Sequence, residues 1–319
     1  MKRLTVVGID VSKLTFDAEW CVGDRVLRDR FDNDAQGAEA LIRAIPARSH
    51  VVMEVTGTYH LQLATRLYEA GYKVSVENPA KPAYFARMKL MRAKTDPVDA
   101  GVLRRYGEYE ALAAWQPPKE IFTEVNQLDR HIVGLQSDLN RVNNRLEGLD
   151  QRVVINAFTR DDLVAQRRDL EARIKRCERE IERLVLVYFR DMYELIRTIP
   201  GVGKKTAIMF IVLTEAFTRF PSAKQFASYL GMTSFIRDSG TSVKGSGAIT
   251  KMGNGRMRQI LYMAALTALT QNKACQDFAA RLKANGKPPK VIRVAVANKL
   301  IRQVFAVFEK QERYSESFA

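Results

Sequence analysis

The strongest constraint on the fold of this chain is a pair of apolar seams in the middle of its sequence. Apolar residues recur there in alternating steps of three and four, which is the spacing of one face of a long helix. The first seam consists of Val125, Leu128, Ile132, Leu135, Leu139, Val142, Leu146, Leu149 and Val153. The second consists of Leu163, Leu170, Ile174, Cys177, Ile181, Leu184 and Tyr188. Although Arg167 interrupts the second seam, the pattern predicts two long helices with a break at residues 156–161.

Two packing arrangements satisfy such seams. The helices either fold on each other as an antiparallel hairpin or pair between subunits, and the sequence does not choose between them. Narrow seams with charged flanks favour pairing between subunits, so we expect a homo-oligomer, either a dimer or a tetramer. The seams also predict three domains: residues 1–120, a helical coiled-coil region at 121–190, and residues 191–319.

Positive charge is concentrated at the C-terminal end of the chain. From Leu195 onward, 20 Lys and Arg stand against 6 Asp and Glu, a net of +14. The remaining residues carry 31 basic and 30 acidic side chains, a net of +1, so nearly all of the formal charge of +15 lies in this last part. A basic domain joined to a neutral one is typical of nucleic-acid-binding proteins. A basic surface that serves only solubility is the alternative.

The sequence carries no signal for secretion or membrane insertion. No apolar run approaches the roughly 18 residues that span a bilayer, and the N-terminus leads directly into a predicted strand without a signal peptide. The three cysteines, Cys21, Cys177 and Cys275, have the spacing of neither a zinc site nor a disulfide framework. We therefore expect a cytoplasmic protein with no membrane partner.

The first 110 residues predict strands and helices in the order β-β-β-α-β-α-β-α. The predicted strands are 4–9, 15–20, 25–31, 51–53 and 73–76. The predicted helices are 34–45, 57–70, 79–91 and 96–106. Three antiparallel strands followed by alternating strands and helices form a ribonuclease-H-like α/β order, so we expect this fold for the N-terminal domain.

Four acidic residues occupy suggestive positions in this domain. Asp10 and Glu54 each follow a predicted strand, at the end where open α/β sheets bind ligands. Asp96 and Asp99 are three residues apart on a predicted helix and therefore share a face. Converging carboxylates repel one another unless a hard cation such as Mg²⁺ binds between them, and two such ions suit phosphoryl transfer. Each residue taken singly has an ordinary explanation as a cap or a surface side chain.

The C-terminal domain begins with a glycine-containing hairpin at residues 199–207. Gly201 and Gly203 permit close approach of the backbone, and the next residues, Lys204 and Lys205, open an apolar helix. Backbone amides at a helix N-terminus, with two lysines beside them, favour an anion such as a phosphate. The segment therefore resembles a helix-hairpin-helix element, and an ordinary turn between helices is the alternative.

A second segment, residues 237–258, is rich in glycine, small side chains and cations. Such a composition cannot build a core and suits contact with a sugar-phosphate backbone, or alternatively a flexible linker. Its cations are Arg237, Lys244, Lys251, Arg256 and Arg258. Helices are predicted after it, at residues 259–269 and 290–308, so the C-terminal domain is expected to be mainly helical.

Six motifs together resemble one known family. GIDVSK (8–13), MEVTGTY (53–59), VENPA (76–80) and KTDPVDA (94–100) occur in that order, followed by SGTSVKG (239–245) and KMGNGRMRQILYMAA (251–265). These are similar to the motifs of the DEDD insertion-sequence transposases, which include bridge-RNA-guided recombinases and Piv-type DNA invertases. The resemblance covers roughly residues 4–110 and 195–305. Ser234 stands where relatives often carry proline.

The resemblance implies a fold and a chemistry. The N-terminal domain is expected to be RuvC-like, with the acidic tetrad on Asp10, Glu54, Asp96 and Asp99. In the C-terminal transposase domain of this family, a serine attacks a DNA phosphate and forms a covalent intermediate. By motif position that serine is Ser239, with Ser242 as the alternative.

The resemblance also implies partners: donor and target DNA duplexes, a structured guide or bridge RNA, and further copies of the chain, acting at the nucleoid of a prokaryotic cell. None of the histidines, His50, His60 and His131, lies near Ser239 in sequence, and we expect His60 on a helix surface. A serine hydroxyl needs activation, so Mg²⁺ held by the tetrad is the expected activator, in a site drawn from two domains.

Two other functions remain possible on these residues. A metal-dependent nuclease of the Holliday-junction resolvase type needs the tetrad but no serine. A non-catalytic nucleic-acid-binding scaffold needs neither. Only a recombinase makes a covalent bond between protein and DNA.

Overall fold

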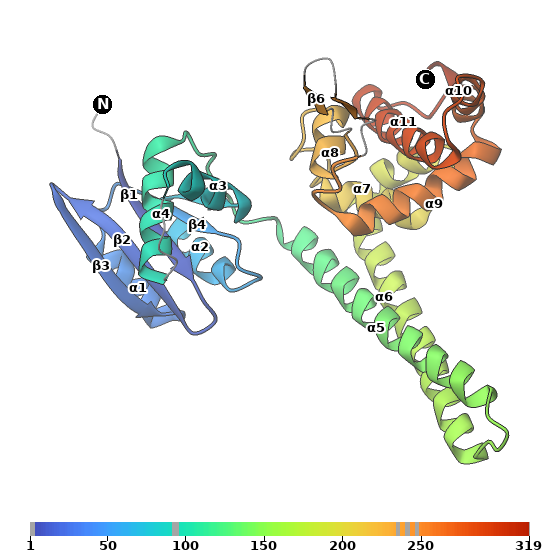
Figure 1. Cartoon of the computed structure of the whole chain (residues 1–319), viewed down its shortest axis with the longest axis horizontal. Coiled ribbons are helices and arrows are strands. Elements are labelled where there is room, and N and C mark those ends of the chain that lie inside the picture. Colours follow the sequence, from blue (N-terminus) through green and yellow to red (C-terminus); the bar gives the residue numbers. More distant parts are fainter. Residues whose placement is uncertain (1–3, 91–95, 234–236, 240–242, 246–248, 319) are drawn as a thin grey trace. The chain divides into compact units, whose positions relative to one another are not determined.

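A computed structural model describes residues 4–90, 96–233, 237–239, 243–245 and 249–318, with the backbone alone described at 96–98, 237–239 and 243–245. The chain divides into two compact units, Met1–Pro118 and Lys119–Ala319 (Figure 1).

The first unit is built on a five-stranded sheet in the order β3-β2-β1-β4-β5. The first three strands are antiparallel, and β4 and β5 run parallel to β1. The strands are β1 (Thr5–Val11), β2 (Thr15–Val22), β3 (Arg25–Asp32), β4 (Ser49–Glu54) and β5 (Lys73–Glu77). The helices are α1 (Ala35–Ala44), α2 (His60–Glu69), α3 (Ala80–Met88) and α4 (Asp96–Tyr109). This arrangement agrees with the ribonuclease-H-like order expected from the sequence.

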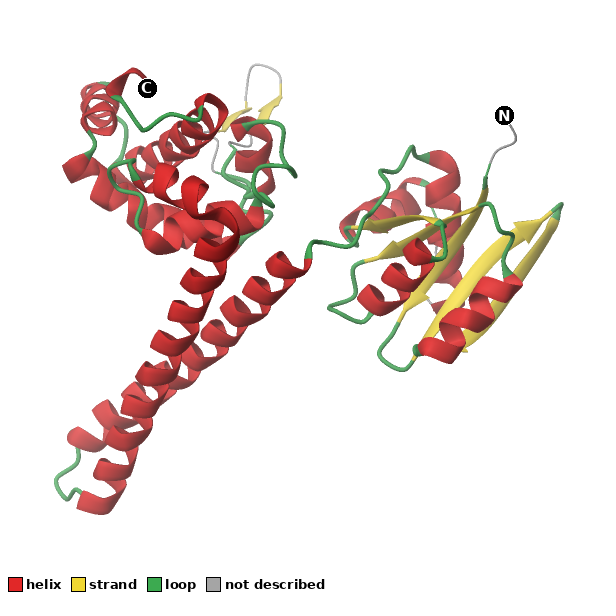
Figure 2. Ribbon diagram, turned by 180° about the vertical axis from the view of Figure 1, so that it is seen from behind, coloured by secondary structure: helices red, strands yellow, loops and turns green. Residues whose placement is uncertain are grey.

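Helices cover both faces of the sheet (Figure 2), and each face has its own hydrophobic core. On one face, Val7, Ile9 and Val11 of β1 pack with Leu41 of α1 and Leu63 of α2. On the other face, Val6 of β1 and Val52 of β4 pack against Phe85 of α3 and against Leu103 and Tyr106 of α4. Because side chains alternate between the two faces along a strand, these contacts show which of the two faces each residue of β1 and β4 occupies.

The second unit begins with the two long helices that the seams predict. These are α5 (Glu120–Asp150) and α6 (Ala157–Arg197), whose helical geometry is interrupted at Phe189. Phe122 stacks on Phe189 with ring centroids 5.5 Å apart, and Arg160 pairs with Asp150 at the opposite end, so the helices are antiparallel. Apart from the exposed Val153 and Tyr188, the seam residues therefore pack within one chain, and the preference for using the seams between subunits is not supported.

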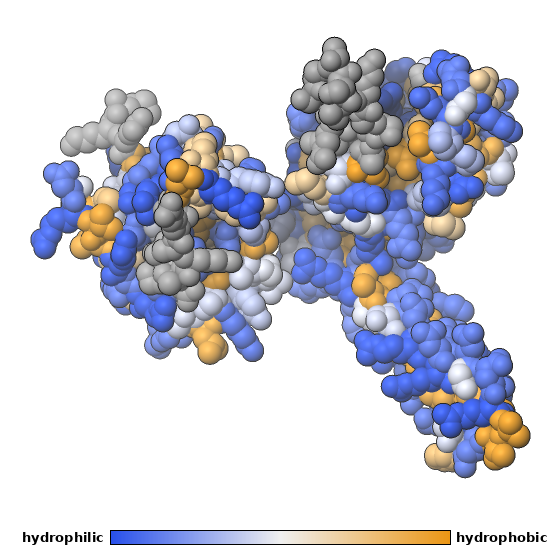
Figure 3. All heavy atoms as spheres, viewed as in Figure 1, coloured by the Kyte–Doolittle hydropathy of each residue, from blue (hydrophilic) through white to orange (hydrophobic). Residues whose placement is uncertain are grey.

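The turn of this hairpin carries an exposed apolar patch. Val153 and Val154 are fully or largely exposed, and so is Phe158 at the start of α6. Figure 3 shows these apolar surfaces at the free end of the hairpin.

The rest of the second unit is mainly helical, as expected, with one small antiparallel pair of strands. The helices are α7 (Lys204–Leu213), α8 (Ala223–Tyr229), α9 (Gly255–Gln271), α10 (Lys273–Ala284) and α11 (Pro289–Lys310), and the strands are β6 (Arg237–Ser239) and β7 (Val243–Gly245). These helices share one core with the end of the α5–α6 hairpin that lies opposite its turn. The core includes Phe210, Phe226, Leu261 and Leu300. Across the parts of the chain that the structure describes, no helix has the length and apolar character needed to cross a membrane.

Candidate functional site

Asp10 and Glu54 lie on neighbouring strands at one edge of the sheet. β1 and β4 are parallel with Ile9 opposite Met53, so the next residue on each strand is the carboxylate. Both belong to the face that α4 covers, since Gly8 and Val52 precede them by two residues on that face. Neighbouring strands are about 4.8 Å apart. The strand register therefore brings these two acids side by side.

Two glycines, Gly8 of β1 and Gly107 of α4, let α4 lie unusually close to this face. A Cβ on Gly8 would lie 2.1 Å from the carbonyl oxygen of Ala100 and 2.3 Å from the amide nitrogen of Arg104. A Cβ on Gly107 would lie 2.6 Å from Val52 and 2.9 Å from Val6. Helix α4 consequently runs antiparallel to β1, with its C-terminal half over Val6 and its first turns extending past Gly8 in the direction of Asp10.

Asp99 lies in that N-terminal part of α4, and it is half-buried. The side chain of Asp96 is outside the described residues, so its distance to the other acids is not defined. Within the described part of the chain, no three His, Cys, Asp or Glu side chains are close enough together to form a metal-binding group. The strand register places Asp10 and Glu54 at one edge of the sheet, and the first turns of α4, which carry Asp99, extend in the direction of that edge.

Sequence reasoning missed a further acid at this edge. Glu77 is the last residue of β5 and pairs in register with Glu54, which places it on the same face. It is buried, and the Nζ atom of Lys81 lies 2.6 Å from its carboxylate. This pairing raises the pKa of Lys81. The available signal was its position at a strand end, which it shares with Asp10 and Glu54.

The expectation that His60 lies on a helix surface is wrong. His60 opens α2 and is only 4% exposed. Burial lowers the pKa of His60, and it lowers the pKa of the buried His50 to about 4, with the charge of Lys73 contributing. Both imidazoles therefore belong to the interior of the first unit.

Ser239 is the last residue of β6, where it pairs with Val243 of β7. The expected nucleophile thus closes one strand of a hairpin, although its side chain is not among those described. Ser242, the alternative, lies outside the described residues.

The glycine hairpin is fixed by packing within the second unit. Gly201 has a φ of +96°, and a Cβ there would lie 2.7 Å from the Cβ of Ala268 on α9. Gly203 is the N-cap of α7. A larger residue at Gly201 would force α9 to move, so packing alone accounts for this glycine, whereas a Cβ on Gly203 would meet no atom within 4 Å.

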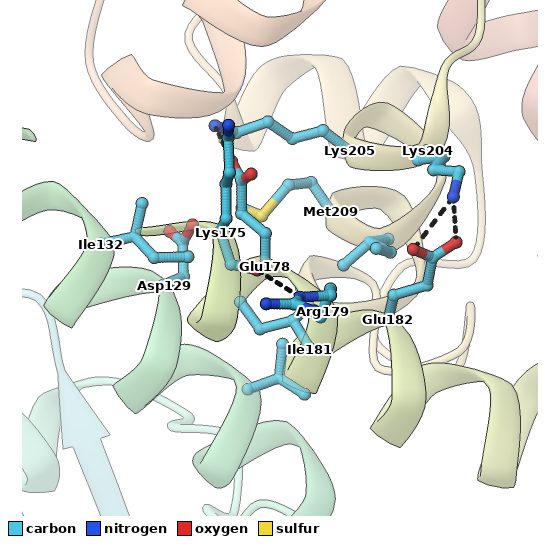
Figure 4. A pocket seen from close by; sticks show the side chains of 12 residues that line it. Asp129, Ile132, Lys175, Glu178, Arg179, Ile181, Glu182, Lys204, Lys205 and Met209 are labelled. Carbon is cyan, nitrogen blue, oxygen red and sulfur yellow. Dashed lines mark hydrogen bonds and ion pairs between the residues drawn. The ribbon is translucent and has the colours of Figure 1, made fainter. Parts of the chain in front are cut away.

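The two lysines that follow are paired with α6. Lys204 lies 2.8 Å from Glu182, and Lys205 lies 3.9 Å from Glu178. These pairs border a cavity of about 540 Å³ between α5, α6 and α7, and Ile181 is among the residues that line it (Figure 4). Both lysines remain at least half exposed, so they can reach solvent and a passing anion.

The remaining predicted cations differ in their surroundings. Arg256 pairs with Asp129 of α5 at 2.5 Å, and Arg258 donates to the carbonyl oxygen of Leu230 at 2.7 Å. Lys251 is exposed. The side chains of two others, Arg237 and Lys244, are not described. Arg256 and Arg258 therefore brace the start of α9 against the rest of the unit.

Comparison with known proteins gives two family matches and several relatives. A family model described as "Transposase" of the DEDD IS110 type matches residues 7–154, and one described as "Transposase IS116/IS110/IS902 family" matches residues 193–280. The chain is 30% identical over 321 residues to the pilin gene-inverting protein of Moraxella bovis, with 98% of each chain covered. The pilin gene-inverting protein of Moraxella lacunata is similar to the same extent.

A shorter match joins the chain to an insertion-element protein. It is 29% identical over 142 residues to an uncharacterized 43.6 kDa protein of insertion element IS110 from Streptomyces coelicolor, covering 44% of this chain and 33% of that one. The first family match covers the carboxylate unit and continues through α5, the second covers much of the basic helical part, and the Moraxella matches extend over nearly the whole length. The chain belongs to the IS116/IS110/IS902 family of transposases.

Proposed function

We propose that this protein is a DNA recombinase that cuts DNA at two sites, exchanges the strands and rejoins them. Membership of a transposase family supports DNA as the substrate and a divalent metal ion as a cofactor. The Moraxella relatives are named for inverting a pilin gene, so inversion is one outcome of the same exchange. The observation that carries the proposal is the adjacency of Asp10 and Glu54 on parallel strands, under the first turns of α4.

The metal site of this proposal consists of Asp10, Glu54, Asp96 and Asp99 and holds two Mg²⁺ ions. Carboxylate oxygens are the ligands that Mg²⁺ prefers, and a cation between neighbouring carboxylates offsets their mutual repulsion. Bound there, the ions would stabilise negative charge on the attacking and leaving oxygens of a phosphoryl transfer. Glu77 pairs with Lys81 at this edge, so it is not counted among the proposed metal ligands.

The nucleophile of this proposal is Ser239. Its Oγ attacks a DNA phosphorus while the bond from phosphorus to one sugar oxygen breaks, and the proton of the hydroxyl leaves as the sugar oxygen becomes a hydroxyl. Attack by a sugar hydroxyl of the exchanged strand reverses the step and frees the serine, so the energy of the DNA linkage is kept. The buried positions of His50 and His60 speak against a histidine base.

Nucleic acid binds, in this proposal, to the basic part of the second unit. Gly201, Gly203, Lys204 and Lys205 present the start of α7 to a phosphate. Further phosphate contacts come from Arg237, Lys244, Lys251, Arg256 and Arg258, of which Arg256 and Arg258 also hold α9 in place. The nucleic acid includes a guide RNA beside the two duplexes, and the protein acts as a homo-oligomer, for which the exposed patch at the hairpin turn is an available surface.

A plasmid assay tests the proposal. The chain is expressed with its flanking RNA and a plasmid carrying two of its recombination sites, and new junctions are detected by PCR. Asp10→Asn and Ser239→Ala should each abolish junctions, whereas Asp24→Asn in the exposed β2–β3 turn should retain them. Junctions that form in Asp10→Asn would remove the metal site from the mechanism. If junctions still form in Ser239→Ala and disappear only when Ser242 is also changed, the nucleophile is Ser242 and not Ser239.

A further inference from the structure

A buried ion pair joins α4 to the middle of the sheet. Glu19 of β2 is opposite Gly8 of β1 and is only 1% exposed. Its carboxylate accepts a hydrogen bond from the Nε atom of Arg104 on α4 at 2.9 Å and from Arg28 on β3 at 2.5 Å. The side chain of Arg104 is also largely buried, at 11% exposed, and bonds to Glu108 on its own helix. A charged pair thus lies inside the helix–sheet interface.

The same carboxylate fits against the helix backbone. A Cβ on Gly101 would lie 2.8 Å from Oε2 of Glu19, so this glycine leaves the space that the carboxylate fills. Together with the contact of Gly8 against Ala100 and Arg104, this gives α4 one register on the sheet. A slip of one residue moves the helix by about 1.5 Å and turns it by about 100°. The buried carboxylate of Glu19 would then no longer face Arg104.

Stability alone does not explain a pair of this kind. Removing two charges from water costs about as much as their attraction returns, and apolar side chains of similar volume often serve equally well. The best-attested use of such pairs is to select one register among several packings of similar energy. The register of α4 has a specific consequence here, because it decides where Asp99 lies relative to Asp10.

We propose that Glu19 and Arg104 are positioning residues for the carboxylate site. They fix the register of α4 and so bring Asp96 and Asp99 to the edge of the sheet that carries Asp10 and Glu54. Arg104 is five residues from Asp99 on the helix, and Glu19 faces a residue two positions from Asp10, so both lie about 7 Å along their elements from the acids. This inference rests on the proposed metal site.

The test is Mn²⁺ binding to the full-length protein, measured from the EPR signal of free Mn²⁺. The double variant Glu19→Gln/Arg104→Met removes both charges and keeps similar volumes. Its Kd for Mn²⁺ should rise about tenfold, as for the loss of residues that orient metal ligands, while its thermal transition stays near that of the wild type. Arg105→Met is the matched control, because it removes the same charge from an exposed neighbour on α4 and should change the Kd by less than about twofold.

The outcomes separate the inference from the function on which it rests. Unchanged Mn²⁺ affinity in a folded double variant, with affinity lost in Asp10→Asn, overturns the positioning role and leaves the metal site intact. Wild-type binding that Asp10→Asn does not alter contradicts the proposed function itself. If the double variant does not fold, Arg104→Lys decides, because it keeps the charge but not the fixed geometry of the guanidinium. A Kd raised at least threefold then supports the proposal, and an equal Kd overturns it.

Discussion

Replacing Gly8 by alanine is the sharpest test of the helix–sheet contact that directs the acids to one edge. The new methyl group would lie 2.1 Å from the carbonyl oxygen of Ala100 and 2.3 Å from the amide nitrogen of Arg104. Both are backbone atoms of a helix, so no side-chain rotation relieves the overlap, and α4 must move away from β1. Overpacking of this kind costs about 3 kcal/mol. The displacement should also abolish recombination.

Urea denaturation of the full-length protein followed by tryptophan fluorescence measures this cost. The chain has 2 tryptophans, Trp20 and Trp115, and both belong to the first unit, so the signal reports its unfolding. With a slope of about 1.5 kcal/mol per molar urea, a loss of about 3 kcal/mol lowers the midpoint by about 2 M.

Gly134→Ala is the control for this measurement. Gly134 lies inside α5, with nothing within 4 Å of a Cβ built on it, and in the other unit. Alanine there should leave the tryptophan transition unchanged and stabilise α5 by about 0.5–1 kcal/mol. A Gly8→Ala protein with the midpoint of the wild type would refute the close seating of α4 and the convergence of acids inferred from it.

Three further predictions concern other parts of the protein. Because His50 is buried with its pKa lowered to about 4, its stabilising contribution is complete above pH 6.5 and is lost as the pH falls through 4. Between pH 7 and pH 4.5 the first unit should lose about 2 kcal/mol more than a His50→Gln variant in urea titrations; an equal loss would contradict the buried neutral imidazole. Gly201→Ala should lower the stability of the second unit by about 2–3 kcal/mol in thermal melts followed by circular dichroism, more than Gly286→Ala, which shares a positive φ but has open space around it. Arg256→Met and Asp129→Asn should each destabilise that unit by about 1–2 kcal/mol, and the double variant by less than their sum; strict additivity would mean that the pair does not interact.

Much of the first unit was predictable because most of its strands are short apolar runs separated by turn residues, β3 being the exposed exception. The alternation of side chains along β1 and β4 then determines which face of the sheet Asp10 and Glu54 occupy. Asp34 was expected near the start of a helix, and it caps α1 by accepting a hydrogen bond from the amide of Gly37 at 2.8 Å. These features depend on local sequence, which is why the sequence reveals them.

Features that depend on distant contacts were not predictable. The seams of α5 and α6 look the same whether the partner helix is in the same chain or in another. Arg256 looked like a free cation, but its partner Asp129 is 127 residues away in sequence. Nothing in the sequence indicated that Glu19 of β2 is buried, because its burial depends on α4, which is distant in sequence. Helix α10 was not predicted, although its helical amphipathicity equals that of α5 and α6.

The central claim is that a serine of this chain becomes joined to DNA while the carboxylate site holds a metal ion. The direct measurement is a denaturing gel of end-labelled donor and target DNA incubated with the protein, its flanking RNA and Mg²⁺. The account predicts a slow-migrating, protease-sensitive band that is absent in Ser239→Ala, absent in Asp10→Asn and absent with EDTA. Cut DNA without an adduct, equal in wild type and Ser239→Ala, would contradict the account and identify a metal-dependent nuclease instead.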